Sequence, residues 1–595
     1  MTEHLGLVPH LVEREDRADG TILLRSGHPL GPVARSTSVW LDHWAAAAPD
    51  RIFLAERAGA GWRTLSYGAA RQRVHRLAAG LLDRAPAGPI LILSGNSIDH
   101  ALLTLAAQYV GLVTVPVAEQ YSLIPAARDR LRYVVDLVRP GLVFADDAAA
   151  YATAFEIAGC PALCSDANGT GATPLHMLEQ DGDVSATHKS VGLDTVAKLL
   201  LTSGSTSDPK AVETTQRMMT TNQAQIATCL PFLTTRPPVL VDWLPWNHVF
   251  GGSHNFNIVL AHGGTLYIDD GKPLPQRFAR TVENLGLVSG TVSFNVPIGF
   301  AQLVKALSAN ADLRRAYFRD LDMIFYAGAS LSQDVWFELE RMALETTGRM
   351  PLITTSWGLT ETAPAALLQH QPSDGAGIVG VPLPGVEVKL CDTGAGRMDV
   401  RVRGPSVFEH YHGDPAKTAE AFDKEGFFLT GDAMQFVDAG NNAQGLRFDG
   451  RLSEDFKLSS GIWVQAARLR LDLLDMLASL AQDVVICGHG RDALGALVFP
   501  GPSAASGTAD AGALVSDAHE DIRKRLVAHL TEAQGSARRI TRLLVLADPP
   551  DIGAGEATAK GNLNFAKVLK HRAHLVDRLY DDHDPAVVTP GKKMH

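Results

Sequence analysis

The sequence has neither a paired-cysteine motif nor a long apolar run. Its five cysteines are scattered over 595 residues and form no CxxC pair, which argues against a disulfide framework and against a zinc site. No uninterrupted apolar run reaches about 18 residues, the length that a membrane-spanning helix needs. The first residues, MTEHLGLVPHLVERED, are too polar for a signal peptide. We therefore expect a cytoplasmic protein with reduced thiols and no membrane partner.

An excess of positive charge is also missing. The chain has 54 Lys and Arg against 65 Asp and Glu, which gives a net charge of −11. This balance argues against a nucleic acid or an anionic membrane as the main partner. Hydrophobic residues make up 46% of the chain and charged residues 20%, a composition typical of globular proteins. The length exceeds that of one ordinary domain.

A Walker-type P-loop is absent as well. The stretch KLLLTSGSTSDPKAV, at 198–212, predicts a buried strand followed by a loop from Ser203 to Pro209. Such a loop offers backbone N–H groups, hydroxyls and the Lys210 ammonium to a polyphosphate. A Walker motif would instead end in Gly-Lys-Ser/Thr and open a helix, and here Lys210 follows Pro209. Taken alone, the stretch is a Ser/Gly-rich turn.

Short apolar runs alternate with amphipathic stretches over the first 350 residues or so. This alternation predicts α/β layers around a largely parallel sheet. A helix is expected after the capping-box spacing between Ser330 and Gln333, with Val335, Leu339 and Met342 on one face. The other elements expected here are strands at 89–95, 239–244 and 321–328, and a helix from His100 to Val110.

From about Gly385 the pattern changes to short alternating runs separated by turns, which predict an antiparallel sheet or a small β-barrel. After Arg451 helix and strand patterns mix again, and the Gly/Ala/Ser-rich stretch at 501–514 is expected to be a surface loop. We predict a large N-terminal domain (1–452) of layered α/β sheets plus a small β-barrel. A smaller α+β domain (453–595) should follow.

Four further stretches place carboxylates, hydroxyls or basic residues at the ends of predicted strands, where α/β folds build their sites. Together with the loop at 203–209, and in this order, they resemble the adenylate-forming family of acyl-CoA synthetases, luciferases and peptide-synthetase adenylation domains, over about residues 35–570. Two longer runs, at 95–123 and 243–273, resemble feruloyl-CoA synthetases in particular. The four stretches are YAGASLS (326–332), TTSWGLTET (354–362), FFLTGD (427–432) and FDGRLSEDFK (448–457).

The resemblance implies that the protein joins a carboxylic acid to AMP with release of pyrophosphate, and then passes the acyl group to a thiol. Asp432 would accept the ribose hydroxyls, Arg451 would reach the ribose and phosphate, and Trp357 would stack on adenine. Glu361, with Thr206 nearby, would hold Mg²⁺ through hard oxygen ligands. The implied ATP/AMP-binding residues are Thr202, Ser203, Gly204, Ser205, Thr206, Lys210, Gly328, Ala329, Ser330, Thr355, Ser356, Trp357, Thr360, Asp432 and Arg451.

The resemblance also implies that the C-terminal domain (453–595) is a mobile lid, and it implies an acid pocket and two catalytic lysines. His248 matches a family histidine near the acyl carboxylate, where it can orient that group. Lys560 is implied as the adenylation lysine, with Lys567 as the alternative, and Lys457 would face the site during thioester formation. The implied acid-pocket residues are His248, Phe250, Ser253, His254 and Asn255.

Three positions depart from the family pattern. Ser207 replaces a usual glycine of the phosphate loop, and serine adopts positive φ less readily than glycine. Asp208 follows it and would repel pyrophosphate unless it points away. Ser453 stands at the hinge, where the family usually carries Asp or Lys.

The resemblance therefore implies an ATP- and Mg²⁺-dependent ligase, monomeric or homodimeric, that couples an aryl acid such as ferulate or a related hydroxycinnamate to coenzyme A. Three alternatives remain open. The enzyme could adenylate an aryl or fatty acid for another thiol acceptor. It could be a P-loop NTPase that cleaves the γ-phosphate, or a nucleotide-binding homologue with impaired catalysis.

Overall fold

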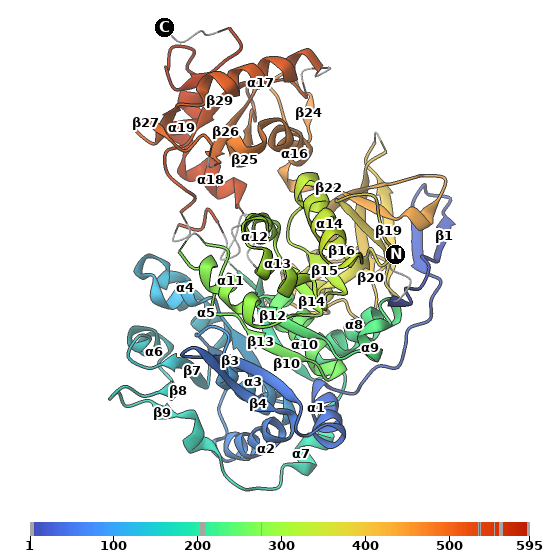
Figure 1. Cartoon of the computed structure of the whole chain (residues 1–595), viewed down its shortest axis with the longest axis vertical. Helices are drawn as coiled ribbons and strands as arrows, with labels where there is room; N and C mark the ends of the chain where they lie inside the picture. Colours follow the sequence, from blue (N-terminus) through green and yellow to red (C-terminus); the bar gives the residue numbers. More distant parts are fainter. Residues whose placement is uncertain are drawn as a thin grey trace.

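The computed structural model describes residues 5–202, 209–274, 276–394, 396–501, 503–532, 535, 537–551, 554–557 and 563–591. These residues form a large α/β part up to about residue 451 and a smaller C-terminal part, which lies at one end of the long axis (Figure 1). None of the described helices is long and apolar enough to cross a membrane.

Two sheets dominate the first 290 residues. In the described part of the chain, one sheet has seven strands in the order β11 (Lys210–Thr215), β10 (Val196–Thr202), β6 (Thr114–Pro116), β5 (Ile90–Ile92), β7 (Leu142–Asp147), β8 (Ala162–Asp166) and β9 (Thr173–Pro174). The central strands β5, β6 and β10 are short, largely buried apolar runs, as a sheet covered by helices on its faces requires. The other sheet has the order β12 (Val239–Asp242), β13 (Thr265–Ile268), β3 (Ile52–Ala58) and β4 (Gly61–Ser66).

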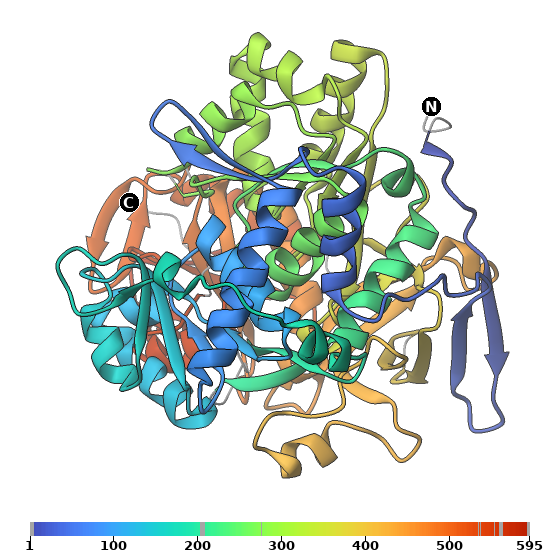
Figure 2. The same cartoon turned by 90° about the horizontal axis from the view of Figure 1, so that it is seen from below.

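A third sheet joins parallel and antiparallel strands. It begins at the hairpin β1–β2, at the edge of the molecule (Figures 1 and 2), and ends in the parallel strands β16, β15 and β14. Its eleven strands, counted over the described residues, run β1 (Val12–Asp16), β2 (Ile22–Ser26), β19 (Glu387–Asp392), β20 (Met398–Arg403), β21 (Phe428–Phe436), β22 (Leu446–Arg451), β18 (Ile378–Pro382), β17 (Ala365–Leu368), β16 (Leu352–Gly358), β15 (Met323–Tyr326) and β14 (Val292–Asn295).

Helices pack on these sheets through their apolar faces. The π-helical segment η4 (Phe250–Asn255) leads into α10 and is buried throughout. The other N-terminal helices are α1 (Thr37–Ala47), α2 (Tyr67–Arg84), α3 (Ile98–Tyr109), α4 (Glu119–Leu123), α5 (Arg128–Val138), α6 (Ala152–Ala158), α7 (Ser185–Ser190), α8 (Gln216–Cys229), α9 (Phe232–Thr235), α10 (Phe256–His262), α11 (Phe278–Leu287), α12 (Pro297–Ala309), α13 (Ala311–Phe318), α14 (Gln333–Thr347) and α15 (Pro415–Glu420).

The C-terminal part has its own apolar cores, built from residues beyond 455. Helix α16 packs on β22 of the large part, and the guanidinium of Arg397 pairs with Asp455. Its elements are β23 (Phe456–Lys457), β24 (Trp463–Val464), α16 (Ala466–Leu477), β25 (Ala481–Cys487), β26 (Leu494–Pro500), β27 (Gly507–Asp510), β28 (Ala513–Ser516), α17 (His519–Glu532), β29 (Ile540–Val545), α18 (Phe565–His571), α19 (Ala573–Leu579) and β30 (Val587–Val588).

Most sequence predictions of single elements are confirmed. Strands β5, β12 and β15 fall within the predicted ranges, and helix α3 begins two residues before and ends one residue before the predicted one. The antiparallel strands, however, continue the parallel ones in a single sheet, where a separate sheet or barrel was expected. A hydrogen bond across the sheet shows that it curls strongly. Trp357 on β16 reaches Asp432 on β21, although these strands are four positions apart in the strand order.

Two local predictions are wrong. The N-cap of α14 is Ser332, not Ser330, and its side chain makes no capping hydrogen bond. The stretch at 501–514 is not only a loop, because the hairpin β27–β28 begins in it and buries Leu514. The domain boundary proposed at 452/453 falls inside a 3₁₀ turn, η7 (Leu452–Glu454), and remains a prediction, as does mobility of the C-terminal part.

Candidate functional site

Asp432 and Arg451 are cross-strand partners on β21 and β22. The Asp432 side chain is only 3% exposed, and its Oδ2 accepts a hydrogen bond of 2.9 Å from Trp357 Nε1. Oδ1 lies 3.4 Å from the Arg451 guanidinium and accepts no hydrogen bond from any described residue. Burial raises the pKa of Asp432, against the opposing effect of Arg451. A buried, ionisable acceptor with an unused oxygen is costly to the apo fold, so this carboxylate is suited to an outside donor.

Glu361 lies next to this pair, on the 3₁₀ turn η5 (Thr360–Thr362) that follows β16. The Tyr411 hydroxyl donates to Glu361 Oε1 at 2.8 Å, and Lys210 Nζ lies 4.6 Å from the centre of the Tyr411 ring. Burial raises the pKa of the Glu361 carboxyl, whereas Tyr411, Lys210 and Arg451 lower it. The fold thus brings two buried carboxylates and two cations, from four separate elements, into one electrostatic cluster.

The residues predicted to surround the adenine lie on the ends of two neighbouring parallel strands. Gly328, Ala329 and Ser330 form an exposed turn after β15, and Gly328 has a φ of +88°, a conformation that favours glycine. Thr355 and Ser356 lie on β16, ahead of Trp357. Trp357 is 7% exposed and packs in the main core, so stacking on adenine remains a prediction for it.

The segment Phe250–Asn255, which we call the acid segment, is held close to the chain that precedes it. A Cβ on Gly251 would lie 2.4 Å from the Leu244 carbonyl oxygen, and one on Gly252 would lie 2.1 Å from that of Trp246. Only glycine therefore fits at both positions. The segment is π-helical, a rare geometry that often marks functional sites.

His254 lies in a ring cluster that we call the aromatic box: Phe250, His254, Phe294 on β14 and Phe325 on β15. The His254 ring centre is 5.6 Å from that of Phe250, 5.5 Å from that of Phe294 and 5.1 Å from that of Phe325. Burial lowers the pKa of His254 to about 4, so the ring is neutral at physiological pH. The box combines an apolar wall with one polar heterocycle.

The tautomer of His254 is set by a relay that begins at Asp242, at the end of β12. Asn255 Nδ2 donates to Asp242 Oδ2 at 2.8 Å, which turns the amide oxygen of Asn255 toward His254 Nδ1, 2.9 Å away. An amide oxygen only accepts hydrogen bonds, so His254 Nδ1 carries the proton and Nε2 is left as an acceptor. Burial raises the pKa of Asp242 to about 7.

The other predicted acid-pocket residues lie on the same stretch. His248 Nδ1 accepts a hydrogen bond of 3.1 Å from the Phe250 amide, so this nitrogen is an acceptor. Ser253 is 1% exposed, and its hydroxyl makes no hydrogen bond to any described residue. The structure therefore carries His248, Ser253 and two members of the aromatic box, Phe250 and His254, on one short stretch.

The remaining predicted residues lie beside Lys210, in the C-terminal part, or outside the described part of the chain. Thr202 ends β10, and its hydroxyl is 3.5 Å from the Lys210 carbonyl oxygen. Lys457 is exposed on β23, with Nζ 4.8 Å from the centre of the Trp463 ring. Lys567 is on α18, and Ser453 is exposed in η7. Ser203, Gly204, Ser205, Thr206, Ser207, Asp208 and Lys560 lie outside the described residues.

Two residues that contact the candidate site residues, Tyr411 and Asp242, were not predicted from the sequence. Tyr411 contacts Glu361 from 50 positions away, and nothing local marks it. Asp242 ends an apolar strand, and an acidic residue there was a usable signal for a buried hydrogen-bonded group. Its partner, Asn255, is 13 residues further on.

Comparison with known proteins places the chain in a family. Residues 41–412 match the family model of the AMP-binding enzyme, and residues 461–584 match that of the AMP-binding enzyme C-terminal domain. The chain is 29% identical over 421 residues to the 4-coumarate–CoA ligase-like protein 6 of Oryza sativa subsp. japonica, covering 63% of this chain and 64% of the relative. It is 26% identical over 249 residues to the probable chloroplastic acyl-activating enzyme 16 of Arabidopsis thaliana, covering 38% of this chain and 34% of the relative.

The chain thus spans about a third of the Arabidopsis protein and just under two thirds of the rice protein. Among solved structures, it resembles the anthranilate CoA ligase AuaEII in complex with anthranoyl-AMP, with a TM-score of 0.72, 17% identity and coverage of 93% of this chain and 99% of that one. This likeness confirms the predicted fold class, a large α/β part followed by a smaller C-terminal part. Because the first family model alone covers more than half of the sequence, the chain belongs to the AMP-binding enzyme family.

Proposed function

We propose that this protein is an ATP-dependent ligase that activates an aryl carboxylic acid as its adenylate and transfers the acyl group to coenzyme A. The observation that carries the first half-reaction is the Asp432 carboxylate, 3% exposed and with an oxygen that no described residue supplies with a hydrogen bond. Two ribose hydroxyls would donate to it, and a carboxylate has enough lone pairs to accept both. Arg451, 47% exposed in its side chain, can turn from Asp432 toward phosphate.

The charge cluster around Glu361 fits the adenylation step. A carboxylate attacking the α-phosphate brings two anions together, so the site must neutralise charge and hold the reactants in line. Lys210 and Arg451 both lower the pKa of the Glu361 carboxyl, so their positive charges reach this part of the site. A magnesium ion would supply further charge neutralisation, and Glu361, a hard oxygen donor oriented by Tyr411, fits it as a ligand. Thr206 is the second proposed ligand.

The aromatic box supports an aryl acid as the substrate. Flat rings of Phe250, Phe294 and Phe325 suit an aromatic ring better than a flexible alkyl chain. His254 Nε2, fixed as an acceptor through Asn255 and Asp242, would take a hydrogen bond from a phenolic hydroxyl. A buried acceptor of this kind discriminates against substrates that leave it unpaired. Hydroxycinnamates such as ferulate combine the ring with such a hydroxyl.

The proposed roles of the two lysines follow the two half-reactions. Lys560 would stabilise charge in the adenylation transition state, an interaction that substrate binding alone does not require. Lys457, exposed on β23 beyond η7, would face the site after the C-terminal part, residues 453–595, rotates about the hinge. A carrier-bound thiol in place of coenzyme A is the alternative acceptor.

The decisive experiment is a panel of aryl and alkyl acids scored for acid-dependent release of pyrophosphate, with and without coenzyme A. We expect hydroxycinnamates to have the highest kcat/KM, and 4-methoxycinnamate, which lacks the donor, to fall below 4-hydroxycinnamate. A fatty acid that exceeded every aryl acid would contradict the substrate class. Formation of ADP and phosphate would contradict adenylation, and tight ATP binding without any pyrophosphate release would indicate an impaired homologue.

A further inference from the structure

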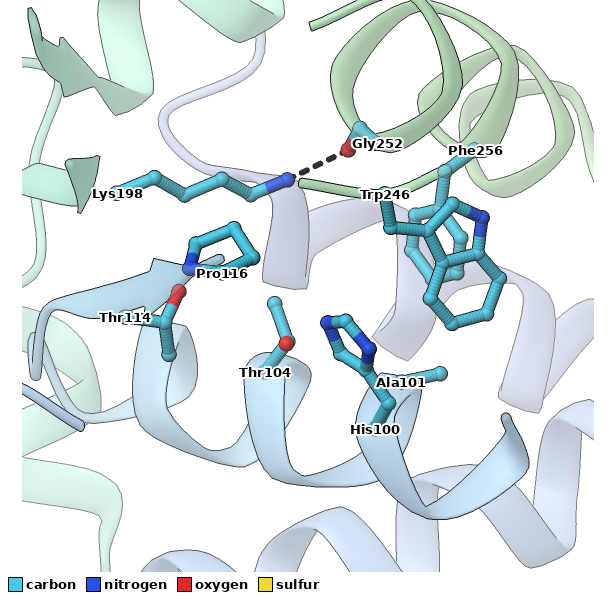
Figure 3. Close-up of a pocket in the computed structure, with 9 residues that line it drawn as sticks. All are labelled: His100, Ala101, Thr104, Thr114, Pro116, Lys198, Trp246, Gly252 and Phe256. Carbon is cyan, nitrogen blue, oxygen red and sulfur yellow. Dashed lines mark hydrogen bonds between the residues drawn. The ribbon is translucent and has the colours of Figure 1, made fainter. Parts of the chain in front are cut away.

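A lysine is buried beneath the acid segment without an acidic partner. Lys198, on β10, is 4% exposed, and no carboxylate of the described residues forms an ion pair with it. Its Nζ donates a hydrogen bond of 2.5 Å to the Gly252 carbonyl oxygen (Figure 3). Burying an ammonium costs free energy unless its hydrogen bonds are satisfied, and a methionine of similar length would avoid this cost.

The ammonium faces a small cavity with a polar side. Lys198, Gly252, His100, Thr104 and Trp246 line it, and Figure 3 shows the His100 ring and the Thr104 hydroxyl on the side opposite Gly252. Thr104 Oγ1 is buried without a hydrogen bond to any described residue. The cavity has room for about one water molecule, so it is far too small for a substrate. Its polar groups therefore do not bind a substrate, and their role is to hold the surrounding segments in place.

The position of Lys198 connects the two halves of the proposed site. Its strand, β10, ends at Thr202 and leads directly into residues 203–208, the predicted phosphate loop. Gly252 belongs to the acid segment and immediately precedes Ser253 and His254. The hydrogen bond therefore joins the strand that feeds the phosphate loop to the segment that carries the acid-binding side chains, 54 residues further along the chain.

We propose that Lys198 is a positioning residue: by holding the Gly252 carbonyl, it fixes the acid segment at the depth where its side chains meet the acid. The proposal rests on the proposed function for the identity of that segment. The π-helical hydrogen bonding of the segment, in which the Phe256 amide bonds to the carbonyl of Gly251 five residues back, leaves its carbonyls in an irregular arrangement. A charge-assisted bond from a buried ammonium is stronger than a neutral one and selects one such arrangement.

The charge state of Lys198 gives a readout that a purely structural residue would not have. Burial lowers the pKa of Lys198 to about 8, so the ammonium loses its charge in mildly alkaline solution and its bond to Gly252 weakens. His100, the other titratable residue that lines the cavity, has a pKa lowered by burial to about 4 and is neutral throughout that range. In the acid segment, burial also keeps His254 neutral there.

The test compares Lys198→Met with Thr104→Val, which changes the same cavity but leaves the lysine bond intact. For Lys198→Met we expect the KM for the acid to rise about tenfold or more, as for one lost charge-assisted hydrogen bond, with the KM for ATP changed less than about twofold. Amides 250–257 should exchange with deuterium faster in this variant. Thr104→Val should leave both KM values and the exchange of these amides unchanged.

Three results would overturn the proposal: an unchanged KM for the acid in Lys198→Met, a parallel rise in both KM values, or unchanged exchange at residues 250–257. If Lys198→Met does not fold, the wild-type protein still decides. With cinnamate, which has no phenol, the KM for the acid should increase at pH values above the pKa of Lys198, while the KM for ATP should not change with pH. A KM for the acid that did not change with pH would refute the proposal. If the wild-type protein activates no acid, the proposed function fails and the exchange measurement alone decides the role of Lys198.

Discussion

Asp432→Asn is the substitution that most directly separates function from stability at this site. The asparagine has the size of the aspartate and keeps an oxygen for the Trp357 indole N–H, 2.9 Å from Oδ2. Alanine would instead leave that buried donor unpaired, at a cost of about 1–3 kcal/mol. The loss of the negative charge leaves Arg451 without its partner, but the Arg451 side chain is 47% exposed and can be solvated by water.

The expected effects on binding and on stability have opposite signs. Removing a charged acceptor from the ribose hydroxyls should cost about 1.5–3 kcal/mol, a loss of about 10- to 150-fold in affinity for ATP and AMP. Because burial raises the pKa of Asp432, the folded protein binds its proton more tightly than the unfolded chain does. Ionisation therefore lowers stability as the pH rises through that pKa, and the neutral asparagine removes the penalty. We expect an equal or higher Tm.

The assay is calorimetric titration of ATP and 2′-deoxy-ATP into both proteins, with Tm measured on the same samples. The wild-type protein should prefer ATP, and the preference should shrink in Asp432→Asn. Asp438→Asn, an exposed position in the turn after β21, is the matched control and should change neither quantity. Unchanged ATP affinity in Asp432→Asn would remove this carboxylate from the nucleotide site. A lower Tm would show that its contacts with Trp357 and Arg451 stabilise the fold more than its burial destabilises it.

Three further experiments test other parts of the site and the fold. Lys560→Ala should abolish adenylate formation yet still convert supplied acyl-AMP and coenzyme A to thioester, and Lys457→Ala should show the opposite imbalance; near-normal adenylation by Lys560→Ala would move the role to Lys567. Tyr411→Phe removes a hydrogen bond that lowers the pKa of Glu361, so the acid limb of the kcat/KM profile should shift to higher pH, and an unshifted limb would contradict a required Glu361 carboxylate. Burial lowers the pKa of His100, His254 and His370 to about 4, 4 and 3; each should therefore reduce the free energy of unfolding by about 1.4 kcal/mol per pH unit as the pH falls below about 6.5, and denaturant titrations with equal midpoints at pH 7.5 and 5.5 would contradict this.

The sequence by itself determined the parts of the protein that local pattern encodes. The apolar runs at 90–92, 239–242 and 323–326 became strands, because alternation and bounded apolar stretches act within a few residues. Trp357, Asp432 and Arg451 were singled out by the resemblance of three short motifs to the adenylate-forming family, at 354–362, 427–432 and 448–457. Local signals were weaker at boundaries: the N-cap of α14 moved from Ser330 to Ser332, because either serine precedes an equally good apolar run.

Only the tertiary structure decided which groups share a contact. The bond from Tyr411 to Glu361 joins residues 50 positions apart, and that from Lys198 to Gly252 joins residues 54 positions apart. The pairing of Trp357 with Asp432, 75 positions apart, depends on how sharply the large sheet curls. Such contacts are set by strand register and by the packing of whole layers, which no window of sequence contains. The tautomer of His254 has the same origin, because it depends on where β12 places Asp242 against the acid segment.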